Sequence, residues 1–133
     1  MAKIGIIGAG SWGIALSVLL HNNGHEITVW SILEDEINML KTEHEHKDKL
    51  PGVKLPEDMI FTTSLPEAIE GKDILVLAVP SPFTRSTSHN MKPYVADGQI
   101  IVNVAKGIEE HTLMTLSQII EEEVPQANVA VLS

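Results

Sequence analysis

Three glycines near the start of the chain, Gly8, Gly10 and Gly13, have the spacing of a dinucleotide-binding turn. They follow an apolar run at residues 4–7 and precede a helix-like run at residues 14–20. Gly8 allows a sharp exit from a strand, Gly10 lets a pyrophosphate approach the backbone, and Gly13 lets the helix pack closely. The free N–H groups and the positive end of the helix dipole then face the phosphates. The flanking strand and helix favour this interpretation over a plain glycine-rich turn.

The end of the next predicted strand, residues 26–30, is where such a unit binds the adenosine ribose, usually through an acid about 20 residues beyond the glycines. Residues 31–33 are Ser-Ile-Leu, so no acid stands directly at the strand end and no arginine is present to hold a 2′-phosphate. Glu34 and Asp35 come next, but they are equally well explained as the first-turn acids of a helix. We therefore expect a weak preference for NAD over NADP.

Two later strands also end in residues suited to a ligand. The apolar run at residues 73–79 is followed by Pro80, and Phe83 then either packs on the cofactor or joins the core at a helix start. Lys106 follows the predicted strand at residues 99–104 and precedes a glycine. A lysine at this edge is placed to meet an anionic substrate or a cofactor phosphate, and a snorkelling surface lysine is the alternative.

His44 and His46 suggest a metal site, but the pattern does not favour one. Residues two apart share a face only on a strand, and no third ligand is evident nearby. We expect a solvated loop and no metal.

Composition limits the possible functions. At 133 residues the chain has the size of one domain, with 44% hydrophobic and 20% charged residues. A net charge of −9 argues against a general nucleic-acid or anionic-membrane surface. The absence of cysteine excludes disulfides and thiolate metal sites, and no apolar run is long enough to span a bilayer. We expect a cytoplasmic protein with neither a nucleic-acid partner nor membrane insertion.

Strands and helices alternate along the chain. The predicted strands are residues 4–7, 26–30, 60–63, 73–79 and 99–104, with a sixth from residue 129, and the predicted helices are residues 14–20, 34–41, 64–69, 83–91 and 112–123. In the last helix the buried stripe is Leu113, Leu116, Ile119 and Ile120. The fold class that follows is α/β, a Rossmann-type, doubly wound and mostly parallel sheet in three αβα layers with strand order 3-2-1-4-5-6.

Together these motifs resemble the N-terminal domain of the bacterial type of NAD(P)-dependent glycerol-3-phosphate dehydrogenase. The resemblance covers all 133 residues, and it is carried by the motif at residues 8–13, Trp30, residues 44–52 with Leu55 and Pro56, residues 79–81 and residues 105–109. It implies that Ser11 and Trp12 touch the cofactor, that Phe83 lies by the nicotinamide half, and that Lys106 contacts both cofactor and glycerol phosphate. The expected cofactor-binding set is Gly8, Gly10, Ser11, Trp12, Gly13, Ile32, Pro80, Phe83 and Lys106, with Lys106 also binding substrate, no catalytic residue and no metal ligand.

The resemblance also implies an activity. The reaction is hydride transfer between NAD or NADP and the pair dihydroxyacetone phosphate and sn-glycerol 3-phosphate. This reaction supplies glycerol phosphate for phospholipid synthesis, and the full-length protein is a candidate homodimer. Members often carry an arginine or histidine just after the tryptophan, and residues 31–33 have neither. The family's catalytic lysine and glycine-rich phosphate loop lie in sequence beyond Ser133, so we expect residues 1–133 to be the dinucleotide-binding domain of a longer protein. A binding module without turnover and another hydroxy-acid dehydrogenase are the alternatives.

Overall fold

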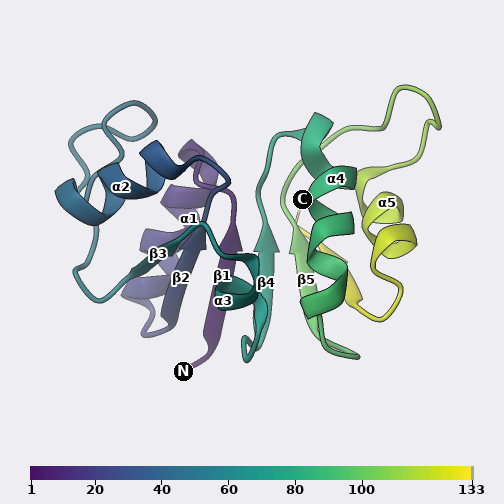
Figure 1. Ribbon diagram of the computed structural model, residues 1–133, viewed down its shortest axis with the longest axis horizontal. Helices are drawn as coiled ribbons and strands as arrows, with labels where there is room; N and C mark the ends of the chain where they lie inside the picture. The colour runs from purple at the N-terminus through teal and green to yellow at the C-terminus, as the bar shows by residue number, and fades with distance from the viewer. Residues whose placement is uncertain (133) are drawn as a thin grey trace.

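The computed structural model describes residues 1–132 and contains a six-stranded, fully parallel sheet (Figure 1). The strands are β1 (Lys3–Ile7), β2 (Glu26–Trp30), β3 (Ile60–Thr62), β4 (Ile74–Leu77), β5 (Ile100–Asn103) and β6 (Asn128–Val131). Their order across the sheet is β3-β2-β1-β4-β5-β6, which confirms the predicted order. The chain leaves β1 for β2 on one side and reaches β4 on the other, so the switch point lies at the carboxyl ends of β1 and β4.

Helices cover both faces of the sheet. They are α1 (Ser11–Asn22), α2 (Glu34–Glu43), α3 (Leu65–Ile69), α4 (Thr84–Met91) and α5 (Leu116–Glu123), with short 3₁₀ turns η1 (Ser81–Phe83) and η2 (Lys92–Tyr94). Apolar residues of α1 and α2 pack on one face of β1 and β2, and those of α3, α4 and α5 pack on the other face of the sheet. The three predicted layers are confirmed. No helix within residues 1–132 has the length and apolar character to cross a membrane.

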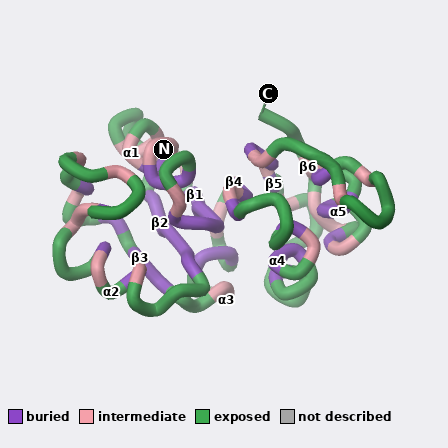
Figure 2. Tube along the Cα trace, turned by 90° about the horizontal axis from the view of Figure 1, so that it is seen from above, coloured by how far each residue is buried: buried purple, intermediate pink, exposed green. Residues whose placement is uncertain are grey.

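The core follows the central strands, and the loops at both ends of the sheet are exposed (Figure 2). Strands β1 and β4 are apolar on both faces because helices cover both of them, as expected for inner strands of a parallel sheet. Gly5 of β1 lies under α3, where a Cβ would meet the backbone oxygen of Ala68. The carboxyl ends of all the strands therefore form one accessible edge above a rigid core.

Two helix boundaries follow from the local chemistry of single residues. Gly24 adopts the left-handed conformation after α1, with φ of +90°, and its N–H donates to the carbonyl of His21 at 2.9 Å. Ser64 precedes α3, and its hydroxyl accepts a hydrogen bond from the N–H of Glu67 at 3.4 Å. These caps stop α1 before β2 and start α3 after β3.

The last helix begins later than predicted. It starts at Leu116, because Thr115 and Gln118 form a capping box in which each side chain accepts a hydrogen bond from the other residue's N–H. Leu113 lies outside the helix in a left-handed conformation and is 69% exposed, so it is not part of the buried stripe. Leu116, Ile119 and Ile120 are buried as predicted.

Other boundaries differ by a few residues. The third strand is Ile60–Thr62, one residue shorter than the predicted 60–63. Residues 83–91 were expected as one helix, but Phe83 ends the 3₁₀ turn η1 and α4 begins at Thr84. The two prolines of the segment before α4, Pro80 and Pro82, favour such a turn over an immediate α-helix.

Candidate dinucleotide-binding site

Two glycines of the turn after β1 are required by the fold itself. Gly8 has a φ of +123°, and a Cβ there would lie 2.7 Å from the carbonyl oxygen of Ala78. A Cβ on Gly13 would lie 2.4 Å from the carbonyl oxygen of Gly8. Any side chain at either position would force backbone atoms apart, so these glycines set the close contact between turn, helix and β4.

Gly10 is different because the protein around it leaves room for a side chain. It precedes α1 with φ of −73° and ψ of −179°, angles that any residue can adopt. Among the described residues, no heavy atom lies within 4 Å of a Cβ built there. No described side chain caps the N–H groups at this helix start either. Open space in front of free N–H groups fits the pyrophosphate of a dinucleotide.

A hollow of about 280 Å³ lies at the switch point, and we call it the central hollow. Three segments line it, namely Gly10, Ser11 and Trp12 from the turn, residues 78–81 after β4, and residues 104–106 after β5. The structure therefore brings together Gly10, Ser11, Trp12, Pro80 and Lys106, which are distant in sequence. Trp12 is 56% exposed, which leaves its ring available to a ligand.

Phe83 and Ile32 lie outside the central hollow. Phe83 is 57% exposed, so the alternative in which it joins the core is wrong. Ile32 is exposed and borders a separate hollow of about 590 Å³ between the end of β2 and the helices α3 and α4. Both residues stay predicted contacts, on either side of the space through which a dinucleotide would extend along the carboxyl edge.

The loop that carries Lys106 is fixed at its start by Asn103. The side-chain amide of Asn103 donates to the carbonyl of Ala105 and its oxygen accepts from the N–H of Ala105, both at 3.1 Å. Gly107 follows with φ of +125°, a conformation that favours glycine. Lys106 is exposed at the rim of the central hollow, a position compatible with either of its two predicted roles.

An ion-pair cluster that the sequence did not suggest holds the far end of this loop. Arg85 of α4 donates two hydrogen bonds, of 2.8 and 2.9 Å, to the carboxylate of Glu109. It also donates to Glu122 at 2.9 Å and to Glu123 at 2.6 Å. Hydrogen bonds from Arg85, and then from Thr112, lower the pKa of Glu109 to about 2. No spacing rule finds such a cluster, because Glu109 is 24 residues from Arg85 and Glu123 is 38 residues away.

Replacing Arg85 by methionine should destabilise the fold in a pH-dependent way. The pKa of Glu109 falls from 4.5 to about 2 in the folded chain. The ionised carboxylate therefore stabilises the fold above about pH 4.5, and this contribution is lost as the pH falls from 4.5 toward 2. Thermal unfolding followed by circular dichroism should show a Tm difference from the parent that is full at neutral pH and narrows below pH 4.5. Lys92→Met is the control, because it removes an exposed charge from η2, the 3₁₀ turn that follows α4. A lowering of Tm in Arg85→Met that does not depend on pH would contradict the assignment.

Lys47, Asp48 and Lys49 are exposed, but the expectation of a solvated loop is wrong at His46. His46 is only 2% exposed, and its Nε2 lies 2.6 Å from a carboxylate oxygen of Glu36. His44 ends α2 in a left-handed conformation, and its ring packs edge-on against Phe61. Within residues 1–132, no group of three or more His, Asp or Glu side chains is arranged to hold a metal ion.

The loop between α2 and β3 also touches the glycine turn. The hydroxyl of Ser11 donates to the carbonyl oxygen of Lys49 at 2.8 Å. Lys49 in turn donates its N–H to Nδ1 of His46 at 3.2 Å. The first turn of α1 and the buried His46 are thus connected through one residue of this loop.

Comparison with known proteins decides the family. Residues 3–133 match the family described as NAD-dependent glycerol-3-phosphate dehydrogenase N-terminus. The chain belongs to this family.

Individual glycerol-3-phosphate dehydrogenases agree with this assignment. The chain is 64% identical, over 99% of its length, to the glycerol-3-phosphate dehydrogenase [NAD(P)+] of Agathobacter rectalis, and 56% identical over its whole length to that of Fusobacterium nucleatum. The crystal structure of the Coxiella burnetii enzyme superimposes with a TM-score of 0.91 at 28% identity, over 98% of this chain and 40% of that one. The chain spans 39% and 40% of the lengths of the two curated relatives.

Membership of the glycerol-3-phosphate dehydrogenase family confirms the resemblance derived from the motifs and the NAD(P) class of cofactor. It also decides against the alternative of a different hydroxy-acid dehydrogenase. The match covers the glycine turn and all six strands, so the central hollow lies within the N-terminal region that defines the family.

Proposed function

We propose that residues 1–133 form the dinucleotide-binding domain of an enzyme that interconverts dihydroxyacetone phosphate and sn-glycerol 3-phosphate with NAD or NADP. The observation that carries the proposal is the central hollow, where free helix N–H groups, the segment after β4 and Lys106 meet at the switch point. An anionic cofactor and an anionic substrate both need the positive groups found there, and the chain as a whole carries a net charge of −9.

Each lining segment has a role in this proposal. The N–H groups behind Gly10 bind the pyrophosphate, Ser11 and Trp12 contact the adjoining part of the cofactor, and Gly8 and Gly13 shape the turn. The bound nicotinamide supplies the hydride chemistry. Pro80 and Phe83 border its side of the edge, and Ile32 borders the adenosine side. Lys106 neutralises the substrate phosphate or polarises its oxygen.

The remaining chemistry belongs to other parts of the protein in this proposal. A helical domain that follows in sequence supplies the general acid and base and most of the substrate pocket, and no residue of this chain has a proton-transfer role. The protein works in the cytoplasm, takes small-molecule substrates, supplies glycerol phosphate for phospholipid synthesis and forms a homodimer at full length. On its own, this chain is a dinucleotide-binding module without turnover.

Calorimetric titration of the chain with NADH and NADPH tests the proposal. We expect weak but measurable heat and a rise in Tm, because the pyrophosphate turn and the Lys106 edge are both present while the facing domain is not. ADP-ribose, which keeps the pyrophosphate and lacks nicotinamide, should compete. The absence of both heat and a thermal shift at millimolar NADH and NADPH would contradict a dinucleotide site.

A further inference from the structure

We propose that Glu36 is a specificity-determining residue that makes this chain prefer NAD to NADP. The inference rests on the proposed function, in which the adenosine ribose lies at the carboxyl end of β2. The family is described as NAD-dependent whereas the two relatives are called NAD(P)+ enzymes, so these names do not decide which cofactor this chain prefers. The structure assigns the choice to a carboxylate that the sequence did not place at the strand end.

The Glu36 carboxylate lies at the end of β2 although its backbone belongs to α2. Ser31 follows the last residue of β2, and its hydroxyl donates to Oε1 of Glu36 at 2.5 Å. The same hydroxyl accepts the N–H of Leu33 at 3.1 Å. The first turn of α2 therefore folds the carboxylate back over the strand end, to the place where an acid that binds the ribose usually stands.

His46 fixes the other oxygen of Glu36. The backbone N–H of Lys49 can only donate, and it points to Nδ1 of His46 at 3.2 Å, so Nδ1 is the acceptor nitrogen of a neutral ring. The ring hydrogen is then on Nε2, which donates to Oε2 of Glu36 at 2.6 Å. Ser31 and His46 are buried, and the Glu36 side chain is 13% exposed. Two hydrogen bonds to nearly buried partners hold the carboxylate in one orientation.

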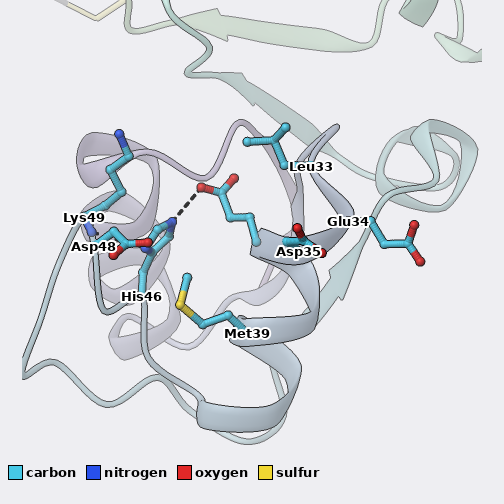
Figure 3. A pocket seen from close by; sticks show the side chains of 8 residues that line it. Leu33, Glu34, Asp35, Met39, His46, Asp48 and Lys49 are labelled. Carbon is cyan, nitrogen blue, oxygen red and sulfur yellow. Dashed lines mark hydrogen bonds and ion pairs between the residues drawn. The ribbon is translucent and has the colours of Figure 1, made fainter.

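Glu36 still reaches a surface that a ligand can occupy. It lines a hollow of about 740 Å³ whose walls are Leu33, Glu34, Asp35, Glu36, Met39, His46, Asp48 and Lys49. Figure 3 shows this hollow, with the hydrogen bond from His46 drawn as a dashed line and Glu34 pointing away from the histidine. A carboxylate has about four acceptor sites, and Ser31 and His46 use two, so Glu36 can also accept a ribose hydroxyl.

A 2′-phosphate in this hollow would meet four acids, Glu34, Asp35, Glu36 and Asp48, against one cation, Lys49, and would find no arginine. Such a group carries a charge of about −1.5 to −2 at neutral pH, so it is repelled by Glu36 and by the acids beside it. Arginine is the residue that accommodates it in NADP enzymes. The only arginine in the sequence is Arg85, and its guanidinium is already bound to Glu109, Glu122 and Glu123.

Titration of the chain with NADH and NADPH, followed by cofactor fluorescence, tests the assignment. We expect the parent to bind NADH more tightly than NADPH. Glu36→Gln should reduce the ratio of the NADPH Kd to the NADH Kd by about tenfold, because glutamine keeps the shape of the side chain and removes its charge. Glu43→Gln is the matched control, since it removes the same charge from the far, exposed end of α2. Its ratio should equal that of the parent.

A second variant keeps the test valid if Glu36→Gln does not fold. Ser31→Ala removes only the hydroxyl that holds Oε1, and we expect it to lower the NADH preference in the same direction by a smaller factor. Circular dichroism melts verify the fold of each variant. Equal affinities of the parent for both cofactors, an unchanged ratio in Glu36→Gln and Ser31→Ala, or an equal change in Glu43→Gln would overturn the assignment. Binding of neither cofactor by the parent would instead contradict the proposed function.

Discussion

Replacing Gly10 by valine should abolish NADH binding and leave the chain folded. The φ and ψ of Gly10 suit any residue, and no described atom of the protein lies within 4 Å of the new Cβ. The cost to the fold is that of a poorer helix-capping residue, about 1 kcal/mol. The valine side chain would stand between the free N–H groups of α1 and the pyrophosphate, so calorimetry should detect no heat while the melting curve stays cooperative.

Gly13→Ala is the matched control for that variant because it should have the opposite effect. Its single added methyl group would lie 2.4 Å from the carbonyl oxygen of Gly8 and cannot fit without moving the backbone. We expect destabilisation of about 1–3 kcal/mol or more, seen as a lower Tm. If Gly10→Val binds NADH as well as the parent does, the turn is not the phosphate site.

Replacing Lys106 by alanine should lower kcat/KM by about 10² in the protein at full length, with dihydroxyacetone phosphate and NADH as substrates. This factor corresponds to about 2.7 kcal/mol, the typical effect of removing one electrostatic contact to a reacting group. The reason is that an anionic substrate would lose its charge partner at the rim of the central hollow. NADH oxidation, followed by its absorbance, measures the effect.

Lys92→Ala is the control for this variant, since Lys92 is an exposed lysine in η2, away from the central hollow. It should keep the parental kcat/KM. A Lys106→Ala enzyme with unchanged kcat/KM would make Lys106 a snorkelling surface residue. The 133-residue chain alone should show only background turnover, and measurable activity would mean that it contains a proton donor that we have not assigned.

The features that the sequence predicts well are those fixed by neighbouring residues. The apolar runs of β1 and β4 are typical of inner strands, and the three glycines define the turn between β1 and α1 within six positions. The start of α5 at Leu116 could also have been predicted from the sequence, because Thr115 and Gln118 have the spacing of a capping box, which is a stronger start signal than the apolar Leu113. Local chemistry of this kind can be interpreted without knowing the fold.

The parts of the site that were missed depend on contacts made only after folding. Glu36 reaches the end of β2 because its side chain extends from the first turn of α2 to the hydroxyl of Ser31, and the spacing of residues 31–36 does not show the direction of that side chain. His46 stands in a polar stretch that suggests solvent, yet its pairing with Glu36 lets it be buried. Arg85 and Glu109 meet only because α4 and the loop after β5 lie side by side.

The ion pair between Arg85 and Glu109 also affects the thermodynamics of ligand binding. Arg85 lies four residues beyond Ser81, and Glu109 lies three residues beyond Lys106, so the ion pair joins the segments that follow two walls of the central hollow before any ligand arrives. The conformational freedom of the loop after β5 is therefore lost when the chain folds and is not lost again on association. Cofactor and substrate therefore meet a preorganised surface. Their binding does not carry the entropic cost of ordering this loop, so their affinity is higher than it would be for a mobile loop.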